Sequence, residues 1–495
     1  MANKKTDHIE FAGDYNLDHV FLHDHMGDIT DIKKVMVELN IYESIYKNAL
    51  TGSIVVADAQ NLISKLEING TERISFKLST PGAVGERNTV DASVETGHPF
   101  HVYKITDRKQ LKPGTLIYTL HFASREFMRN LRTKVSQAYE GRYDTAVLKI
   151  LLDENYLDSK KELSYEPTGN SDKVVIPNLR PFDAINMMSR KALPEKSDGV
   201  GYYFYETTKG IYFRSWENMV SVRGSYDRPT KQDFYYMPMN VNDETIKDKM
   251  NHDYKSVESY KFINNFHDIA ANTVQGTYGH KVISHNLFDK SYRETSYSYH
   301  DEFPFTKHTE VANEKSIRER YAVSGSNVDE RPKDTIRNTS KLSDYNESRV
   351  SLQSTTQFLH DTDAGGYGLD VKQDGPKLAE GISQLNQVIN GTALHMVVKG
   401  QSYLEPGDLI QFNLLSVDEK NPDGKQDPQY SGKYVITKIR HQINSTKYTM
   451  AIEAAKDSTK RGFTVNEFKI EKNKNISRLR NTYTKEEPDE QDYYS

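Results

Sequence analysis

Two stretches of the chain, one toward each end, repeat the same pattern of alternating apolar residues, and this repeat constrains the fold more than any other feature. The first stretch follows Leu66-Glu67-Ile68-Asn69-Gly70, and the second follows Leu404-Glu405-Pro406-Gly407. Alternate residues of a β-strand point to the same side of a sheet, so each stretch predicts a strand with one buried face. The residues on that face are Ile74, Phe76 and Leu78 in the first stretch and Ile410, Phe412 and Leu414 in the second.

The repeat extends to two further predicted strands, which follow in the same order in both stretches. Val102 to Ile105 and Tyr118-Thr119-Leu120 correspond to Val435 to Ile439 and Tyr448-Thr449-Met450. We therefore predict two β-units of similar plan, around residues 66–122 and 404–452. The predicted core of these units also contains Tyr118, Leu120, Tyr434 and Tyr448. Because any two β-sandwiches or barrels share alternating apolar strands, two unrelated β-domains are the alternative.

The region between the two β-units changes its apolar period. Residues 30–122 predict an antiparallel β-unit in which Val35, Val37, Leu39 and Ile41 lie on one face, whereas residues 124–195 predict three helices. The first helix is capped by Ser124 and ends at Gly141, the second follows Asp144, and the third begins near Pro181 and stops by Pro194. Their predicted inward residues are Phe127, Met128, Leu131, Val135 and Ala138; Val147, Ile150 and Leu151; and Phe182, Ile185 and Met188.

The later part of the chain mixes strands with polar segments. An aromatic hairpin is predicted at Tyr202 to Tyr205 and Ile211 to Arg214, with Lys209-Gly210 as its turn. Residues 246–310 have β character, and the polar run at 311–370 predicts a mobile loop. A helical stripe precedes the last strands, and residues 458–495 predict a tail that is first basic and then acidic. The stripe is formed by Leu378, Ile382, Leu385, Val388 and Ile389.

Composition excludes several classes of protein. The chain of 495 residues contains no Cys, which excludes disulfides, thiolate zinc sites and iron–sulfur clusters. Its formal net charge of −5 argues against a protein whose main role is to hold phosphates, so DNA is expected only in passage. The N-terminus leads into no apolar targeting segment, and the longest apolar runs are too short to span a membrane. We therefore expect no membrane anchoring and assembly in a cytoplasm.

The sequence shows no motif of established catalytic chemistry. It lacks a P-loop, a complete GxGxxG, HExxH, GxSxG and an EF-hand loop. His23-Asp24-His25 with Asp28 has metal-ligand chemistry, but a polar loop is the favoured interpretation. A second group of polar residues, rich in side-chain oxygens, has the chemistry of a calcium site, but a solvated turn is its favoured interpretation. That group comprises Asp418, Asn421, Asp423 and Asp427.

We consequently expect no catalytic residue, no bound metal and no cofactor. Two interpretations stay open. A pair of carboxylates suited to sugar hydrolysis is defined by its separation in the fold and not by the sequence. The aromatic hairpin is predicted to pack in a core or an interface, and stacking on bases or sugars is its alternative.

Four segments in fixed order resemble the baseplate hub proteins of contractile-tailed phages, whose fold is shared by the hub part of type VI secretion spike proteins. The resemblance covers about residues 30–460 and rests on strand edges and turns. The segments are Tyr42-Glu43-Ser44-Ile45-Tyr46 with Leu50-Thr51-Gly52-Ser53-Ile54; Tyr118-Thr119-Leu120-His121-Phe122-Ala123-Ser124-Arg125-Glu126; Ile176-Pro177-Asn178-Leu179-Arg180-Pro181-Phe182; and Gly432-Lys433-Tyr434-Val435-Ile436 with Ile439-Arg440-His441.

The resemblance implies a mainly β (α+β), multidomain chain with two similar β-barrel tube-type domains. The first would span 1–123, and the second would be split between 199–245 and 376–457. A helical insertion would occupy 124–198, an insertion with a β-ribbon and a mobile loop would occupy 246–375, and the tail would occupy 458–495. The long insertion and the tail depart from compact members of the family.

The resemblance further implies a structural virion protein without enzymatic activity. Such a hub is a homotrimer in which six similar domains form a pseudo-sixfold ring that joins the tail tube to the central spike and nucleates tail assembly. Expected partners are a tail tube or tube-initiator protein, the central spike protein and baseplate wedge proteins, in the baseplate of the virion after assembly in the host cytoplasm. A cell-wall-degrading tail enzyme and a host-receptor-binding adhesin are the alternatives.

Overall fold

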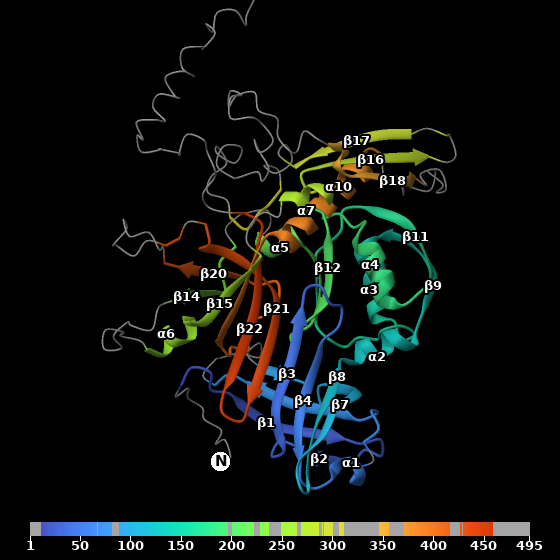
Figure 1. Cartoon of the computed structure of the whole chain (residues 1–495). Helices are drawn as coiled ribbons and strands as arrows, with labels where there is room; N and C mark the ends of the chain where they lie inside the picture. The colour runs from blue at the N-terminus through green and yellow to red at the C-terminus, as the bar shows by residue number, and fades with distance from the viewer. Residues whose placement is uncertain are drawn as a thin grey trace, which may run out of the picture.

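The computed structural model shows a mainly β chain in which most helices lie in two groups outside the largest sheet, α2 to α4 in one and α5, α7 and α10 in the other (Figure 1). The structure describes residues 11–458 except for 67, 82–88, 197–199, 222–227, 237–248, 265–268, 287–289, 291, 300–305, 311–345, 356–370, 416–425 and 428. The predicted mainly β fold class is confirmed, but within the described residues strand pairing closes neither β-unit into the predicted barrel. In this described part of the chain, no helix has both the length and the apolar character that a membrane crossing requires.

The first β-unit lies at the N-terminal end of the chain and is drawn in blue in Figure 1. Its neighbouring strands follow the order β3-β4-β8-β7-β5-β1-β2, and β6 pairs with β5. The rings of Phe76, Phe100 and Phe122 pack together in its core, with centroids 4.8 to 6.2 Å apart. The elements are β1 (Asn16–His23), β2 (Ile29–Asp31), β3 (Met36–Ser44), β4 (Thr51–Asp58), α1 (Leu62–Lys65), β5 (Arg73–Ser79), β6 (Thr89–Asp91), β7 (Phe100–Lys112) and β8 (Thr115–Ala123).

The second β-unit comes mainly from the C-terminal part and has the strand order β15-β19-β22-β21-β20-β14. One isolated bridge joins Tyr235 of β14 to Ser256, the residue before β15, so strand pairing does not close this unit into a complete barrel in the described residues. The elements are β14 (Gln232–Tyr236), α6 (Lys249–Lys255), β15 (Val257–Asn264), β19 (Thr392–Lys399), β20 (Leu409–Leu414), β21 (Gly432–Asn444) and β22 (Tyr448–Lys456).

The two β-units share one strand order. Strands β3, β4, β8, β7 and β5 of the first unit correspond to β15, β19, β22, β21 and β20 of the second, and β21 pairs with β3 to join both units into one 14-stranded sheet. The register also corresponds, because Ile74 faces Phe100 across β5 and β7 while Ile410 faces Tyr434 across β20 and β21. The pairing shifts by one residue at the same level of β7 and β21, at Tyr103 and Thr437.

One pair of strands in the predicted repeat was aligned two residues out of register. Leu120 lies opposite Ile105, and Ile452 lies opposite the corresponding Ile439, so Leu120 corresponds to Ile452 and not to Met450. A shift of two residues keeps every side chain on the same face of a strand, and the apolar alternation therefore could not detect it.

The predicted alternation on β3 was wrong at one residue. A β-bulge between Met36 and Glu38 moves Met36 into the core and leaves Val37 43% exposed. Strand β15 has a shift at the corresponding place, between Val257 and Ser259. The bulge is thus a further feature that the two units share.

The segment at 124–195 is not purely helical as predicted. Its first helix ends at Arg132, and Val135 and Ala138 lie in a strand that pairs with a distant partner, β11. The second and third predicted helices are confirmed. The elements are α2 (Arg125–Arg132), β9 (Val135–Arg142), α3 (Tyr143–Leu152), β10 (Leu163–Tyr165), β11 (Ser171–Leu179) and α4 (Pro181–Ser189).

The predicted aromatic hairpin is present, but it lies outside the second β-unit. Strands β12 (Tyr202–Glu206) and β13 (Ile211–Ser215) form a separate sheet with β10. Among its described residues, the segment 199–245 therefore contributes only β14 to the second unit's sheet, whereas β15, from the predicted insertion 246–375, belongs to that sheet. Helix α5 (Trp216–Val220) follows the hairpin.

The remaining described elements form a small layer at the top of Figure 1. Strand β16 lies between β17 and β18. Most of the predicted mobile loop at 311–370 and nearly all of the tail at 458–495 lie outside the described residues. On α10, Val388 is buried, whereas Leu385 and Ile389 are more than 40% exposed. The elements are α7 (Ile269–Val274), β16 (Gly279–Asn286), β17 (Tyr292–Ser298), η7 (Asn346–Ser348), β18 (Val350–Thr355) and α10 (Val371–Asn390).

Candidate functional site

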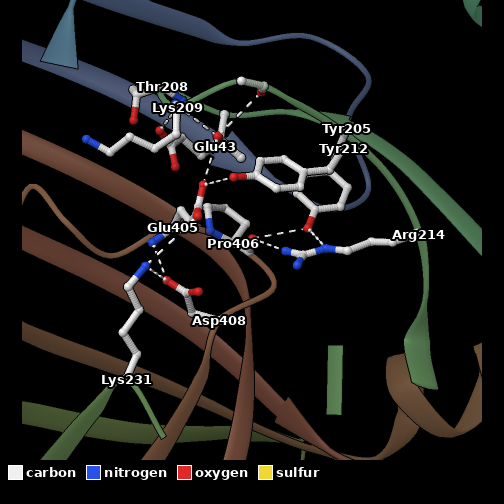
Figure 2. Close-up of polar contacts among 12 residues, drawn as sticks. Glu43, Tyr205, Thr208, Lys209, Tyr212, Arg214, Lys231, Glu405, Pro406 and Asp408 are labelled. Atoms are coloured by element: carbon white, nitrogen blue, oxygen red, sulfur yellow. Dashed lines mark hydrogen bonds and ion pairs between the residues drawn. The ribbon is translucent and has the colours of Figure 1, made fainter. Parts of the chain in front are cut away.

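A polar pocket of about 400 Å³ lies where the β12–β13 hairpin meets the loop before β20. Figure 2 shows side chains from both segments, with Glu43 from β3 close by. Four cationic and three anionic side chains line the pocket, so the fold brings charges of both signs together around one cavity. The charged residues are Glu162, Lys209, Arg214, Arg228, Lys231, Glu405 and Asp408.

Arg214 connects the hairpin to the loop. Its guanidinium lies over the rings of Tyr205 and Tyr212, 5.6 and 4.6 Å from their centroids. Its Nε donates to the hydroxyl of Tyr205 at 2.7 Å, and a terminal nitrogen donates to the carbonyl of Pro406. A buried guanidinium with these partners is held in one position.

Two carboxylates of the loop complete the pocket. Glu405 accepts hydrogen bonds from Tyr212 at 2.7 Å and from Thr207 at 3.2 Å. Asp408 accepts from the Lys231 ammonium at 2.8 Å and from the backbone N–H of Glu405 at 3.0 Å. Burial, followed by the neighbouring charge of Asp408, raises the pKa of Glu405.

The polar pocket thus holds two neighbouring carboxylates, the arrangement that the sequence left open for sugar hydrolysis. Here both carboxylates accept hydrogen bonds from the protein itself, and the tyrosine and arginine side chains beside them are equally engaged. These contacts fasten the aromatic hairpin to the second β-unit. The favoured interpretation of the hairpin as packing against another part of the protein agrees with this geometry.

A second buried cluster fastens the same hairpin to the first β-unit. Glu206, at the end of β12, forms an ion pair with Lys161 and accepts hydrogen bonds from the Ser124 hydroxyl at 2.6 Å and the Leu50 N–H at 2.8 Å. Glu126 also lies 3.9 Å from Lys161. The negative charges of Glu206 and Glu126 outweigh burial and raise the pKa of Lys161, so the lysine is charged at neutral pH.

The pairing of β3 with β21, which we call the internal joint, holds the two β-units together. Arg440 of β21 forms an ion pair with Glu38 of β3 at 3.1 Å, and its Nε donates to Asn40 at 2.9 Å. Behind this exposed contact, the fully buried His441 lies 3.7 Å from Glu43 and is hydrogen bonded to Tyr448. Main-chain pairing and charge therefore both contribute to the joint.

A third cluster ties part of the 246–375 segment to the end of β22. The Asp457 carboxylate is hydrogen bonded to the His308 ring at 3.0 Å. It also accepts hydrogen bonds from the N–H and the hydroxyl of Thr309, both at 2.9 Å, and from the indole N–H of Trp216 at 3.2 Å. Burial raises the pKa of Asp457, but the charge and hydrogen bond of His308 and the bonds from Thr309 outweigh it and lower the pKa to about 2.

The Asp457 cluster predicts a loss of stability in acid. The folded pKa of about 2 lies below the value of about 3.9 in an unfolded chain, so the stabilisation is complete above the unfolded pKa and is lost as the pH falls through the folded pKa. We expect Asp457 to account for about 2 kcal/mol of the fall in the free energy of unfolding between pH 4 and 2. Urea unfolding followed by Trp216 fluorescence measures it, and Asp457→Asn should flatten the dependence. Equal pH slopes in the two proteins would contradict the assignment.

The structure places the predicted repeat-unit core residues in one apolar cluster that runs through both units. Nine are at most 1% exposed, and Leu414 is partly buried at the edge of the cluster. The nine are Ile74, Phe76, Leu78, Tyr118, Leu120, Ile410, Phe412, Tyr434 and Tyr448. The sequence pattern placed several pocket residues only in strands and turns, namely Lys209, Gly210, Tyr212, Arg214 and Glu405, and no motif marked the pocket.

The two candidate metal-binding groups of the sequence are not brought together as metal sites in the described residues. His23 is hydrogen bonded to Ser75 at 2.7 Å, and Asp24 accepts from the N–H groups of Met26 and Asp28, as in a polar turn. Asp418, Asn421 and Asp423 lie outside the described residues, and Asp427 caps its own turn. The described part of the chain contains no group of three or more His, Asp or Glu side chains suited to a metal ion.

The fold is similar to those of phage tail proteins. A tail protein from Neisseria meningitidis MC58 is 8% identical with a TM-score of 0.46, over 90% of this chain and 97% of that one. The 43 kDa tail protein of prophage MuSo2 from Shewanella oneidensis is 7% identical with a TM-score of 0.48, over 89% and 99%. A type VI secretion component of Escherichia coli is 8% identical with a TM-score of 0.37, over 87% and 75%. No family model matches the chain, and no curated protein matches its sequence.

Proposed function

We propose that this chain is a structural subunit of a contractile tail, a trimeric baseplate hub that joins a sixfold tail tube to a threefold spike and nucleates tail assembly. The observation that supports this proposal is the internal repeat, in which two β-units share strand order, register and two β-bulges. Three copies of such a chain present six similar units around one axis, which matches a sixfold partner on one side and a threefold partner on the other.

The partners of the hub are a tube or tube-initiator protein, the spike and wedge proteins, and DNA only passes through it. It works in the virion baseplate after assembly in the host cytoplasm. The polar pocket has a structural part in this proposal, because its charged groups hold the hairpin between the two β-units.

The oligomeric state tests this proposal. Light scattering after size exclusion should show a monomer–trimer equilibrium that moves to the trimer as the concentration rises or the spike protein is added. Images of the trimer should show a threefold ring with six similar lobes. A chain that stays monomeric at every concentration and binds neither tube nor spike would refute the hub.

A wall-degrading enzyme is the second candidate, and the Glu405–Asp408 pair in the polar pocket is the observation that favours it. Purified protein should then clear peptidoglycan, and Glu405→Gln should abolish the clearing. We expect no clearing by either protein.

A further inference from the structure

The internal joint has a counterpart whose two halves are separate in the chain, one on the terminal strand β15 and the other on the part of β7 that extends beyond its pairing with β5. By the correspondence of the two β-units, β15 is the equivalent of β3, and β7 is the equivalent of β21. Within the described residues, the outer edge of β15 meets another strand only at the bridge of Ser256, and residues 104–112 of β7 pair only with β8. Each chain therefore has one formed joint and the two separate halves of a second one.

Strand β15 contains one residue more than the corresponding part of β3, at one point along the edge that could pair with another strand. Lys261 takes the place of Asn40, because they pair with the corresponding residues His395 and Ser53. Asn264 likewise takes the place of Tyr42. Two residues, Phe262 and Ile263, lie between Lys261 and Asn264, whereas β3 has Ile41 alone.

The edge of β7 carries an insertion of the same length. Thr106 corresponds to Arg440 and Lys109 corresponds to Gln442, because their partners on β8 and β22 correspond. Asp107 and Arg108 lie between them, where β21 has His441 alone. Asp107 has a φ of 56°, the left-handed conformation of a bulge residue.

The two insertions lie at the same level of the joint. In the internal joint, Asn40 faces Gln442 and Tyr42 faces Arg440. The extra residue of β15 and the extra residue of β7 both lie between the positions that correspond to these two facing pairs. An extra residue on one edge alone would shift the register beyond it, whereas one on each edge preserves it. The free edge of β15 is thus matched in length to the free edge of β7, which lies in the other unit.

We propose that β15 of one copy pairs antiparallel with residues 104–112 of β7 of a second copy, so that the joint between copies repeats the internal joint. Lys261 then lies opposite Lys109, and Asn264 lies opposite Thr106. The contact is head-to-tail, and three copies close the ring that the proposed function requires. This inference rests on the proposed function and specifies the surface through which copies of the chain meet.

The two joints differ in charge. The internal joint contains the Arg440–Glu38 ion pair, whereas the joint between copies places two exposed lysines opposite each other. Like charges directly opposite on neighbouring strands repel, and salt screens them. The trimer should therefore dissociate on dilution and should be strengthened by salt.

Charge reversal tests the pairing in the full chain. Lys261→Glu and Lys109→Glu should each replace a repulsive pair by an attractive one and raise the association constant of each contact by a factor of about 2 to 5. The concentration at which half the protein is trimeric should therefore fall. The double variant should return close to the unaltered protein, because it restores a like-charge pair. Lys134→Glu, at an exposed residue between α2 and β9, is the control for net charge and should change nothing.

Cross-linking provides a second measurement, made simple by the absence of Cys from the chain. Lys109→Cys with Lys261→Cys should yield covalently linked trimers under oxidation or with a short bismaleimide, and either cysteine alone should not. Trimers that neither cross-link nor respond to charge reversal would refute the proposed joint between copies, but they would be consistent with the proposed hub function. A chain that is monomeric in all variants would overturn both proposals.

Discussion

Replacing Glu206 with alanine should lower the free energy of unfolding by about 3 kcal/mol, the lower end for a broken buried ion pair, because the Lys161 ammonium loses its nearer carboxylate and keeps only Glu126 at 3.9 Å. The loss should be large because Glu206 also accepts hydrogen bonds from the Ser124 hydroxyl and the Leu50 N–H, which would lose a buried acceptor. Urea unfolding monitored through Trp216 measures the change, since this single tryptophan is fully buried beside the hairpin.

A neutral cluster separates charge from packing in this experiment. Glu206→Gln combined with Lys161→Met and Glu126→Gln keeps side chains of similar size and an acceptor for Ser124, and it removes all three buried charges. The combined variant should therefore lose much less stability than Glu206→Ala. If both lose the same amount, the unpaired ammonium is not the cause and the cluster acts through packing alone.

The sequence predicted those parts of the fold in which local pattern and tertiary pairing agree. Strands β5, β8, β20 and β22 were predictable because their alternating residues all face one core. Helices α3 and α4 were predictable because Val147, Ile150, Ile185 and Met188 repeat at helical spacing and are buried. The repeat itself was visible at the two turns that precede β5 and β20.

The errors occurred where a distant partner decides the structure. Val135 and Ala138 continue the helical spacing of α2, but β11 pairs with this segment and makes it a strand. Val37 fits the alternation of β3, but a bulge reverses the faces beside it. The polar pocket had no local signal either, because Tyr212, Arg214 and Glu405 meet only after the hairpin has packed against the second β-unit.

In both β-units, a small residue faces a large one across two neighbouring strands, but the strand that carries the small residue differs. In the first unit, Gly52 of β4 lies opposite Phe122 of β8, and in the second, Leu394 of β19 lies opposite Ala454 of β22. These positions correspond, so a small residue beside a large one in one unit matches a large residue beside a small one in the other. Each pair can therefore fill a similar volume.

Gly52→Leu should consequently disrupt the first β-unit, and truncation of its neighbour should offset part of the damage. A Cβ on Gly52 would lie 2.2 Å from the ring of Phe122 and 2.5 Å from the carbonyl oxygen of Asn40, so the single variant should lose about 3 kcal/mol or more, at the upper end of overpacking effects. Phe122→Ala alone should lower the free energy of unfolding by about 3 to 5 kcal/mol, because it leaves a cavity.

The double variant should lose about 1 to 3 kcal/mol less than the sum of the two single losses, because the leucine then occupies space that the ring has left. Strictly additive losses in urea unfolding would mean that the two units do not share this packing, and the structural equivalence on which the sixfold ring depends would then be confined to their strand order.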